Sequence, residues 1–283
     1  MKAAIKSALR RLVNVSVGLM GKTSVGRYFF EQILDNAMGR TLTVEHRGTR
    51  LKLAVPNGLN RYRADTFATK EPETLEWIDR IPEKSVLWDI GANVGLYSCY
   101  AAKARGCRVF AFEPSVFNLE ILARNIFLNQ LTDQITIVPL ALSDRLAFST
   151  LNMTSTDWGG SLSTFGQSYG HDGAEISKVF ELPTIGLSMS DAVSLLDIPR
   201  PAYIKMDVDG IEHLILKGGL AILRDIREAS IEINDSFTTQ AMEATRCLEA
   251  AGLSFKEKRH AEHLDLQSGA ARFTFNQIWV NTR

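Results

Sequence analysis

Asp89 lies in a short apolar run, residues 86–90, and is followed by Gly91 and Gly95, four residues apart. The run is too short for a helix and rich enough in Val, Leu and Ile for a buried parallel strand, and residues 96–104 can continue as a helix. The glycines would let a ligand lie against bare backbone at the N-terminus of that helix. A dinucleotide site needs Gly-x-Gly-x-x-Gly, and a carboxylate at the strand end would repel pyrophosphate. The observed pattern, Asp-x-Gly-x-x-x-Gly, therefore favours a cationic ligand.

S-adenosylmethionine fits this requirement because it carries a sulfonium and an ammonium, so Asp89 indicates a methyl-donor site. The alternative is a strand-to-helix turn that binds no cofactor. A second apolar strand, residues 107–112, also ends in an acid, Glu113, which could accept hydrogen bonds from the ribose of an adenosine cofactor. Asp144 follows a third strand, residues 135–138, and could accept the adenine amino group or simply form a turn.

Three more acids, Asp207, Asp209 and Glu212, follow a fourth apolar strand at residues 201–206. So many carboxylates at one strand end would be unfavourable unless they shared a cation or a proton. We therefore expect the chemistry to take place there. The alternative is one capping Asp and two solvated acids.

Residues 154–173 are rich in Ser, Thr and Gly and include Trp158 and Tyr169. A loop of this length inside a compact domain is usually disordered or functional. We interpret it as a lid over the acceptor.

The remaining pattern predicts the elements that position these residues. Polarity alternates around a glycine turn over residues 41–55, which predicts a β-hairpin, and Thr69 can cap a helix that runs to residue 78. Further helices are predicted at 118–128, 189–196, 211–226 and 238–251, and further strands at 147–153, 180–185, 229–234, 253–258 and 272–280. Alternating strands and helices predict an open, mostly parallel sheet, and the closing strand pair predicts one antiparallel strand. Ligands bind at the carboxyl ends of such sheets, where the acids lie.

The composition sets limits on the class of protein. The chain has 283 residues, with 32 Lys and Arg balanced by 32 Asp and Glu, so no overall positive field favours nucleic acid as a partner. Three cysteines, Cys99, Cys107 and Cys247, lack metal-ligand spacing and indicate reduced thiols and a cytoplasmic protein. No stretch is long and apolar enough to predict a transmembrane segment.

The N-terminal residues 2–20 form a basic amphipathic pattern, in which Ile5 and Leu9 fall on one helical face and Lys6 and Arg10 on another. Such a helix could make peripheral contact with an anionic membrane or could pack on its own domain. Packing or fraying is favoured, because the apolar face has no aromatic anchor.

Taken together, five motifs resemble those of the FkbM-type S-adenosylmethionine-dependent methyltransferases. The resemblance covers roughly residues 65 to 280, and the motifs are Lys70-Glu71-Pro72-Glu73-Thr74, Trp88-Asp89-Ile90-Gly91-Ala92-Asn93-Val94-Gly95, Phe112-Glu113-Pro114, Ala141-Leu142-Ser143-Asp144 and Lys205-Met206-Asp207-Val208-Asp209-Gly210-Ile211-Glu212. It implies a class I methyltransferase (Rossmann-like) α/β fold, with a seven-stranded, mostly parallel sheet and one antiparallel edge strand. To this we add an N-terminal helix and β-hairpin. The predicted domains are an appendage at 1–64 and an S-adenosylmethionine-binding domain at 65–283.

The same resemblance implies O-methylation of a hydroxyl, on a sugar in a glycan or on another secondary metabolite. It places the cofactor by motif position: Asp89, Gly91, Ala92, Asn93 and Gly95 around the methionine moiety, Glu113 and Pro114 at the ribose, Ser143 and Asp144 near adenine, Glu71 and Thr74 closing over the cofactor, and Asp207 beside it. Asp209 stands where the family more often has Glu. The oligomeric state is not predicted.

Methyl transfer to a hydroxyl needs an aligned acceptor and a group that removes its proton. Asp207 or Asp209 is the predicted base or orienting group, and His171 and His213 are further candidates. A second hypothesis is a divalent cation held by Asp207 with Asn234 or Asp235, which would acidify the hydroxyl. Two alternatives to methyl transfer are an NAD-type nucleotide-dependent oxidoreductase and a non-catalytic cofactor-binding module of the same fold.

Overall fold

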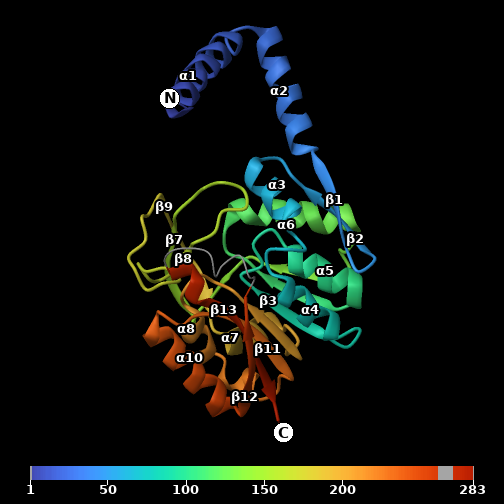
Figure 1. Ribbon diagram of the computed structural model, residues 1–283, viewed down its shortest axis with the longest axis vertical. Helices are drawn as coiled ribbons and strands as arrows, with labels where there is room; N and C mark the ends of the chain where they lie inside the picture. Colours follow the sequence, from blue (N-terminus) through green and yellow to red (C-terminus); the bar gives the residue numbers. More distant parts are fainter. Residues whose placement is uncertain (1, 261–269, 283) are drawn as a thin grey trace.

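The computed structural model describes residues 2–260 and 270–282. Within these ranges the central sheet has seven strands, which lie in the order β12 (Leu253–Arg259), β13 (Thr274–Asn281), β11 (Glu228–Asn234), β10 (Tyr203–Met206), β3 (Val86–Ile90), β4 (Arg108–Phe112) and β5 (Ile135–Val138) (Figure 1). All of these run in one direction except β13, which is antiparallel to both of its neighbours. The structure therefore has the predicted α/β architecture with a mostly parallel sheet.

The antiparallel strand is not the edge strand, so this part of the sequence prediction is wrong. β13 lies between β11 and β12, and β12 forms the edge. Burial gives the reason: the middle of β13, from Asn276 to Trp279, is buried, whereas β12 is mostly exposed beyond Leu253. The chain thus places its more apolar closing strand inside the sheet, and a short 3₁₀ helix, Ala270–Phe273, leads into it.

Successive residues of the central strands point into two separate cores, as the alternation of side chains along a strand requires. Leu87 and Val109 belong to one core, and the next residues, Trp88 and Phe110, belong to the other. The first core is covered by α4 (Pro72–Arg80), α5 (Leu96–Arg105) and α6 (Val116–Asn129), and the second by α7 (Met189–Leu196), α8 (Glu212–Lys217), α9 (Leu220–Leu223) and α10 (Thr238–Ala251).

Two predicted helices have different limits in the structure. α4 begins after Glu71, which occupies the N-cap position, so the predicted cap at Thr69 is wrong; the Thr69 N–H instead closes a turn onto the Thr66 carbonyl. The helix predicted over 211–226 is divided into α8 and α9 at Gly218 and Gly219. A Cβ at Gly218 would lie 2.6 Å from the backbone carbonyl oxygen of Ser143, so close packing requires glycine there. A Cβ at Gly219 would lie 1.7 Å from the side-chain methyl group of Met189.

A second sheet, of four strands, covers the carboxyl end of β5. It contains β6 (Ala141–Leu142), β9 (Phe180–Leu187), β7 (Ala147–Met153) and β8 (Thr164–Phe165), in that order. Two of these strands were predicted, but their assembly into a separate sheet was not. The sheet anchors both ends of the loop between β7 and β8, which reaches over the carboxyl ends of the central strands.

The predicted hairpin, β1 (Thr41–His46) and β2 (Thr49–Ala54), packs with α3 (Gly58–Asp65) against the first core. Leu51 and Leu53 are fully buried in it, and the Asn125 side chain joins the Ala54 N–H to the Val94 carbonyl, each at 2.8 Å. The division of the chain at residue 64 stays a prediction, and this packing favours a division near residue 40 instead.

The first two helices, α1 (Lys2–Met20) and α2 (Ser24–Met38), extend away from this body (Figure 1). Every side chain of α1 that the structure describes is exposed, so the predicted packing of this helix on its own domain is not observed. α2 was not predicted. None of the helices in the described ranges is long and apolar enough to cross a membrane.

The three cysteines are free, as predicted, with Cys99 and Cys107 buried and Cys247 partly buried. Burial raises the pKa of the Cys99 thiol to about 12 and that of Cys107 to about 11, and it also raises the pKa of Cys247. The thiolate is the nucleophilic form, so these side chains are inert packing groups at neutral pH.

Candidate active site

Close packing and a left-handed backbone favour glycine at positions 91 and 95 in the turn after β3. Gly91 has a φ of +81°, and a Cβ there would lie 1.8 Å from the Asp207 carbonyl oxygen. Gly95 has a φ of +77°, and a Cβ there would lie 2.2 Å from a leucine side chain of α6. The N–H groups of Gly91 and Ala92 both donate to the Phe112 carbonyl at 3.0 Å. The turn is thereby held between the carboxyl ends of β4 and β10.

Asp89 lies beneath this turn and lines none of the cavities described below. Its side chain is 1% exposed, and its Oδ2 accepts a hydrogen bond from Ser98 Oγ at 2.5 Å. Burial raises the pKa of Asp89, although the nearby Lys205 ammonium opposes the shift. A direct contact between Asp89 and the methionine moiety stays a prediction.

Three adjoining cavities surround the turn, and Gly91, Asn93 and Asp207 line all three of them. We call the first the apolar lobe; it has a volume of about 70 Å³ and is lined by side chains that include Phe112, Leu140, Leu142, Phe165 and Ile211. The second, the polar lobe, has a volume of about 260 Å³ and is lined by side chains that include Arg63, Glu73, His171, Asp209 and Glu232. The third, the lysine lobe, has a volume of about 50 Å³ and is lined by side chains that include Phe67, Lys70, Glu71, Tyr97 and Lys205.

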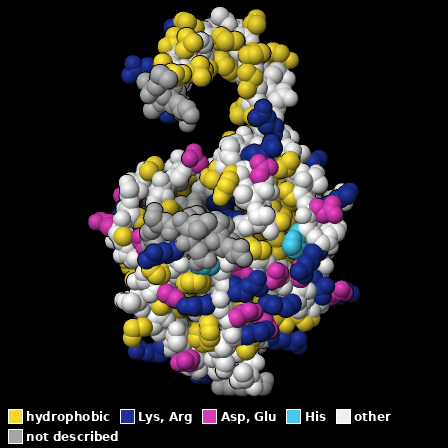
Figure 2. Space-filling model, in the orientation of Figure 1, with side chains coloured by type: hydrophobic (Ala, Val, Ile, Leu, Met, Phe, Trp, Pro, Cys, Tyr) yellow, Lys and Arg dark blue, Asp and Glu magenta, His cyan; other side chains and the backbone are white. Residues whose placement is uncertain are grey.

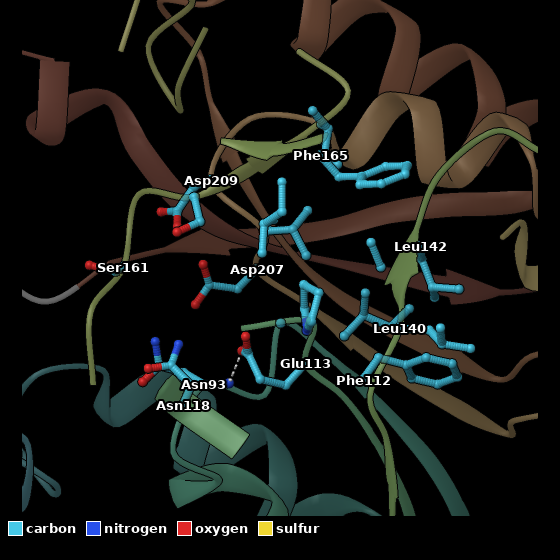
Figure 3. Close-up of a pocket in the computed structure, with 18 of the residues that line it drawn as sticks. Asn93, Phe112, Glu113, Asn118, Leu140, Leu142, Ser161, Phe165, Asp207 and Asp209 are labelled. Atoms are coloured by element: carbon cyan, nitrogen blue, oxygen red, sulfur yellow. Dashed lines mark hydrogen bonds between the residues drawn. The ribbon is translucent and has the colours of Figure 1, made fainter. Parts of the chain in front are cut away.

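Glu113 forms a polar corner of the apolar lobe, next to Pro114. Figure 3 shows this carboxylate and Asp207 on one side of the lobe and the apolar side chains on the other. One Glu113 oxygen accepts from the Asn93 N–H and the other from the Ser115 N–H, both at 2.8 Å. Burial raises the pKa of Glu113 to about 7, although these two hydrogen bonds oppose the shift. Each oxygen retains a lone pair for a further donor.

Ser143 and Asp144 do not line the three lobes, although the sequence places them near adenine. The wall at this strand end is formed by residues 140–142 instead. After Leu142 the chain turns toward β9, since the Ser143 N–H donates to the Leu187 carbonyl at 2.8 Å, and Asp144 forms an ion pair with Arg145 at 3.0 Å. Their contact with a cofactor stays a prediction.

Asp207, which borders all three lobes, is held ionised by a buried lysine. Lys205 is 3% exposed, and its Nζ lies 3.1 Å from Asp207 Oδ2. Burial would raise the pKa of Asp207, but Lys205 and, more weakly, Lys70 hold it well below its usual range. Burial and Asp207 raise the pKa of Glu232 well above its ordinary value, so protonated Glu232 donates a hydrogen bond to Asp207.

Asp209 borders the apolar and polar lobes and has the opposite shift. Burial, followed by the negative charge of Asp207, raises the pKa of Asp209 to about 6. Its Oδ2 accepts from the Leu162 N–H at 2.6 Å. Glu212 braces this loop from below, because its carboxylate accepts the N–H groups of Val208 and Gly210 at 3.0 and 3.1 Å. The two aspartates at this strand end are therefore in different charge states near pH 6.

The two candidate histidines separate in the structure. His171 lines the polar lobe, as do Glu71 and the two aspartates. His213 is buried on α8 against the ring of Phe237, with ring centroids 6.2 Å apart, and burial lowers its pKa. His213 does not reach the lobes, so we interpret it as a packing residue.

Glu71 lines the lysine lobe, and the Thr74 side chain contacts Glu71. Lys70 Nζ pairs with Glu71 Oε1 at 2.7 Å, and Thr74 Oγ1 donates to the other oxygen of Glu71 at 3.4 Å. Thr74 is buried and supports Glu71 without lining a lobe.

The hypothetical cation site does not assemble around Asp207. Asn234 Oδ1 accepts from the N–H and the hydroxyl of Ser236, and Asp235 pairs with Lys258. In the part of the chain that the structure describes, no cluster of three or more His, Cys, Asp and Glu side chains could hold a metal ion.

The loop between β7 and β8 is fastened over the turn through three consecutive backbone carbonyls. The donors are Asn57 and Asn60 to Trp158, Arg63 to Gly159, and Asn93 and Asn118 to Gly160, at 2.6 to 3.1 Å. Ser161 and Leu162 then line the polar lobe, which places part of the predicted lid against the site. Whether the loop opens to admit an acceptor stays a prediction.

Arg63, Asn118 and Lys205 line the lobes, although the sequence motifs did not predict them as site residues. Lys205 could have been found, because it stands two residues before Asp207 and therefore on the same side of the strand. Arg63 and Asn118 carry no such signal, since only the folded chain brings them to the loop.

A family model described as the methyltransferase FkbM domain matches residues 89–265. The hexuronic acid methyltransferase AglP of Haloferax volcanii is 26% identical over 179 residues, which cover 62% of this chain and 66% of that protein. The chain thus spans slightly less than two thirds of this relative.

Solved structures with similar folds include the methyltransferase FkbM from Methylobacillus flagellatus KT, at 13% identity and a TM-score of 0.48 over 78% of this chain and 52% of that one. Trm5 of Methanocaldococcus jannaschii, in complex with adenosine, is 14% identical, with a TM-score of 0.46 over 86% of this chain and 56% of that one. The chain spans about half the length of both.

Proposed function

Because the chain belongs to the FkbM methyltransferase family, we propose that it transfers a methyl group from S-adenosylmethionine to a hydroxyl of a sugar, in a glycan or another secondary metabolite. The observation that carries this proposal is the meeting of three chemically different cavities at Asp207. Two of them suit the two ends of the cofactor, and the third leaves room for an acceptor.

The donor set fits S-adenosylmethionine. The apolar lobe offers apolar side chains for an aromatic base and the Glu113 carboxylate for ribose hydroxyls. The lysine lobe offers Glu71 and Asp207 to an ammonium and Lys70 to a carboxylate. When bound, the cofactor supplies a methyl group that its sulfonium has already activated.

The acceptor hydroxyl then lies in the polar lobe, where Asp209 takes its proton. A general base works best when its pKa is near the operating pH, and Asp209 meets this condition with a pKa of about 6. Asp207 is a poorer base because Lys205 holds its pKa low, and it orients the hydroxyl as a permanent negative charge. Alignment and proton removal are the main tasks for such a displacement.

Arg63 supports an acidic sugar as the acceptor. It lines the polar lobe, and among the described residues it has no carboxylate partner, since its Nε and Nη2 groups donate to the Gly159 carbonyl. An arginine in this position can bind a carboxylate in the bidentate manner. The name of the relative AglP, a hexuronic acid methyltransferase, points to the same class of acceptor.

The NAD-type oxidoreductase is disfavoured by the family and by the absence of Gly-x-Gly-x-x-Gly after β3. The non-catalytic module remains the alternative that an assay must separate. It predicts cofactor binding without transfer to any acceptor.

The proposal is tested by incubating the full chain with methyl-labelled S-adenosylmethionine and oligosaccharides that end in a hexuronic acid, with matched hexose-terminated oligosaccharides alongside. We expect label in the hexuronic acid series, and we expect it to survive mild alkali, because a methyl ether is stable there and a methyl ester is not. Alkali-labile label would show that the sugar carboxylate is methylated instead of a hydroxyl. A carboxylate is already deprotonated, so Asp209 would not be needed as a base. Cofactor binding with no transfer to either series would favour the non-catalytic module.

A further inference from the structure

The α1–α2 extension, residues 2–40, carries an unusual amount of exposed apolar surface. Figure 2 shows hydrophobic side chains gathered over both helices. Those on α1 are at least 40% exposed and include Ile5, Leu9, Leu12, Val13, Val15, Val17, Leu19 and Met20. Those on α2 are at least 48% exposed and include Val25, Tyr28, Phe29, Ile33 and Leu34. Contiguous apolar patches of this kind mark interaction surfaces on soluble chains.

Both helices are amphipathic. On α1, Ile5, Leu9 and Leu12 share one face, and Arg10 and Arg11 lie on the opposite side. On α2, Val25, Phe29 and Ile33 recur at four-residue spacing and share a face. α2 also supplies the aromatic side chains that α1 lacks, which removes the sequence-based argument against a membrane contact.

The extension is strongly basic. Residues 1–40 contain seven Lys and Arg against two acids, a net charge of +5, whereas the whole chain is neutral. A second copy of this chain would place one +5 surface against another, which Coulomb repulsion disfavours. An anionic bilayer offers the complementary charge, at about 1 kcal/mol per Lys or Arg near the surface.

We propose that α1 and α2 dock on the surface of an anionic lipid bilayer, with their apolar faces in the headgroup region and their basic residues at the phosphates. α2 leads into β1, and the hairpin of β1 and β2 leads into α3, which carries Arg63 of the polar lobe. Docking therefore holds the acceptor cavity close to the membrane and favours acceptors carried on lipid. The docking itself does not depend on the proposed methyl transfer.

The experiment is flotation of the full chain with vesicles of phosphatidylcholine alone or of phosphatidylcholine mixed with phosphatidylglycerol. We expect binding to the anionic vesicles that weakens as salt is raised. The double variant Arg10→Gln/Arg11→Gln should bind about 25-fold more weakly, taking about fivefold per charge. The matched control Lys217→Gln/Arg224→Gln, at exposed positions on the body, should bind like the wild type.

The variant Phe29→Ser/Ile33→Ser should lose at least about tenfold in binding to anionic vesicles. Its matched control, Phe127→Ser/Phe148→Ser, removes two body side chains that are each 77% exposed and should bind like the wild type. Equal binding to neutral vesicles, or no binding to anionic ones, would overturn the proposal. A stable dimer in sedimentation that Phe29→Ser/Ile33→Ser dissociates, together with no binding to vesicles, would also overturn it. The apolar face would then join two copies of the chain.

Discussion

Asp209→Asn is expected to lower kcat by about 10²- to 10⁴-fold, the usual contribution of a general base. The asparagine keeps the size of the side chain and its oxygen toward the Leu162 N–H, but it cannot accept a proton. Cofactor affinity should change much less than kcat, because Asp209 lies outside the lysine lobe and the asparagine keeps the size of the side chain where it borders the apolar lobe. The matched control is Asp157→Asn, an exposed acid of the loop between β7 and β8, which should keep its activity.

The pH profile separates a base from a merely structural aspartate. Asp209 has a pKa raised to about 6, and the base must be deprotonated to act, so kcat/KM of the wild type for the acceptor, measured at saturating cofactor, should fall below about pH 6 and level off above it. The profile of Asp209→Asn should lack this acidic limb. If the variant keeps the limb and loses less than tenfold in kcat, Asp209 is not the base, and His171, which also lines the polar lobe, becomes the first candidate.

Gly91→Ala is expected to destabilise the protein by several kcal/mol and to abolish activity. The new Cβ would lie 1.8 Å from the Asp207 carbonyl oxygen, so the ends of β3 and β10 would have to separate where all three lobes meet. Adding a methyl group to a tightly packed site typically costs about 1–3 kcal/mol, and the left-handed backbone adds about 1–2 kcal/mol. The measurement is the free energy of unfolding in urea, together with turnover.

Gly48→Ala is the matched control, because Gly48 has the same φ of +81° but no atom within 4 Å of its missing Cβ. It should lose only the cost of the left-handed backbone and should keep its activity. If both variants lose the same free energy of unfolding, the chain accommodates the new Cβ beside Asp207 at no extra cost. The turn after β3 would then not be rigid.

The order of strands and helices could be predicted where apolar residues recur with a clear strand or helix period. Strands β3, β4 and β10 are mostly apolar and buried, and an acid stands at the end of each or directly after it, so their carboxyl ends could be recognised as one ligand-binding edge. Glu113, Asp207 and Asp209 were found in this way, and all three line the lobes.

What the sequence could not supply depends on contacts between distant segments. Asp89 looks like a ligand-facing acid in the motif, yet its burial beneath the turn follows from the packing of Ser98 on α5. The pKa values of Asp207 and Asp209 differ because the Lys205 ammonium lies beside Asp207, whereas the neighbouring charge at Asp209 is that of Asp207 itself, and a count of acids does not contain these positions. α2 could have been predicted, because Val25, Phe29 and Ile33 recur at four-residue spacing after the N-cap residue Thr23.

The most direct test of the central claim is a calorimetric titration of the full chain with S-adenosylhomocysteine and, separately, with NAD. We expect micromolar binding of S-adenosylhomocysteine and no binding of NAD. In Glu113→Ala the affinity should fall about 10- to 100-fold, since charged hydrogen bonds to the ribose are lost, whereas the exposed control Glu175→Ala should bind like the wild type. Binding of NAD alone, or of neither compound, would contradict the account, and the three lobes around Gly91 would then have to serve another ligand.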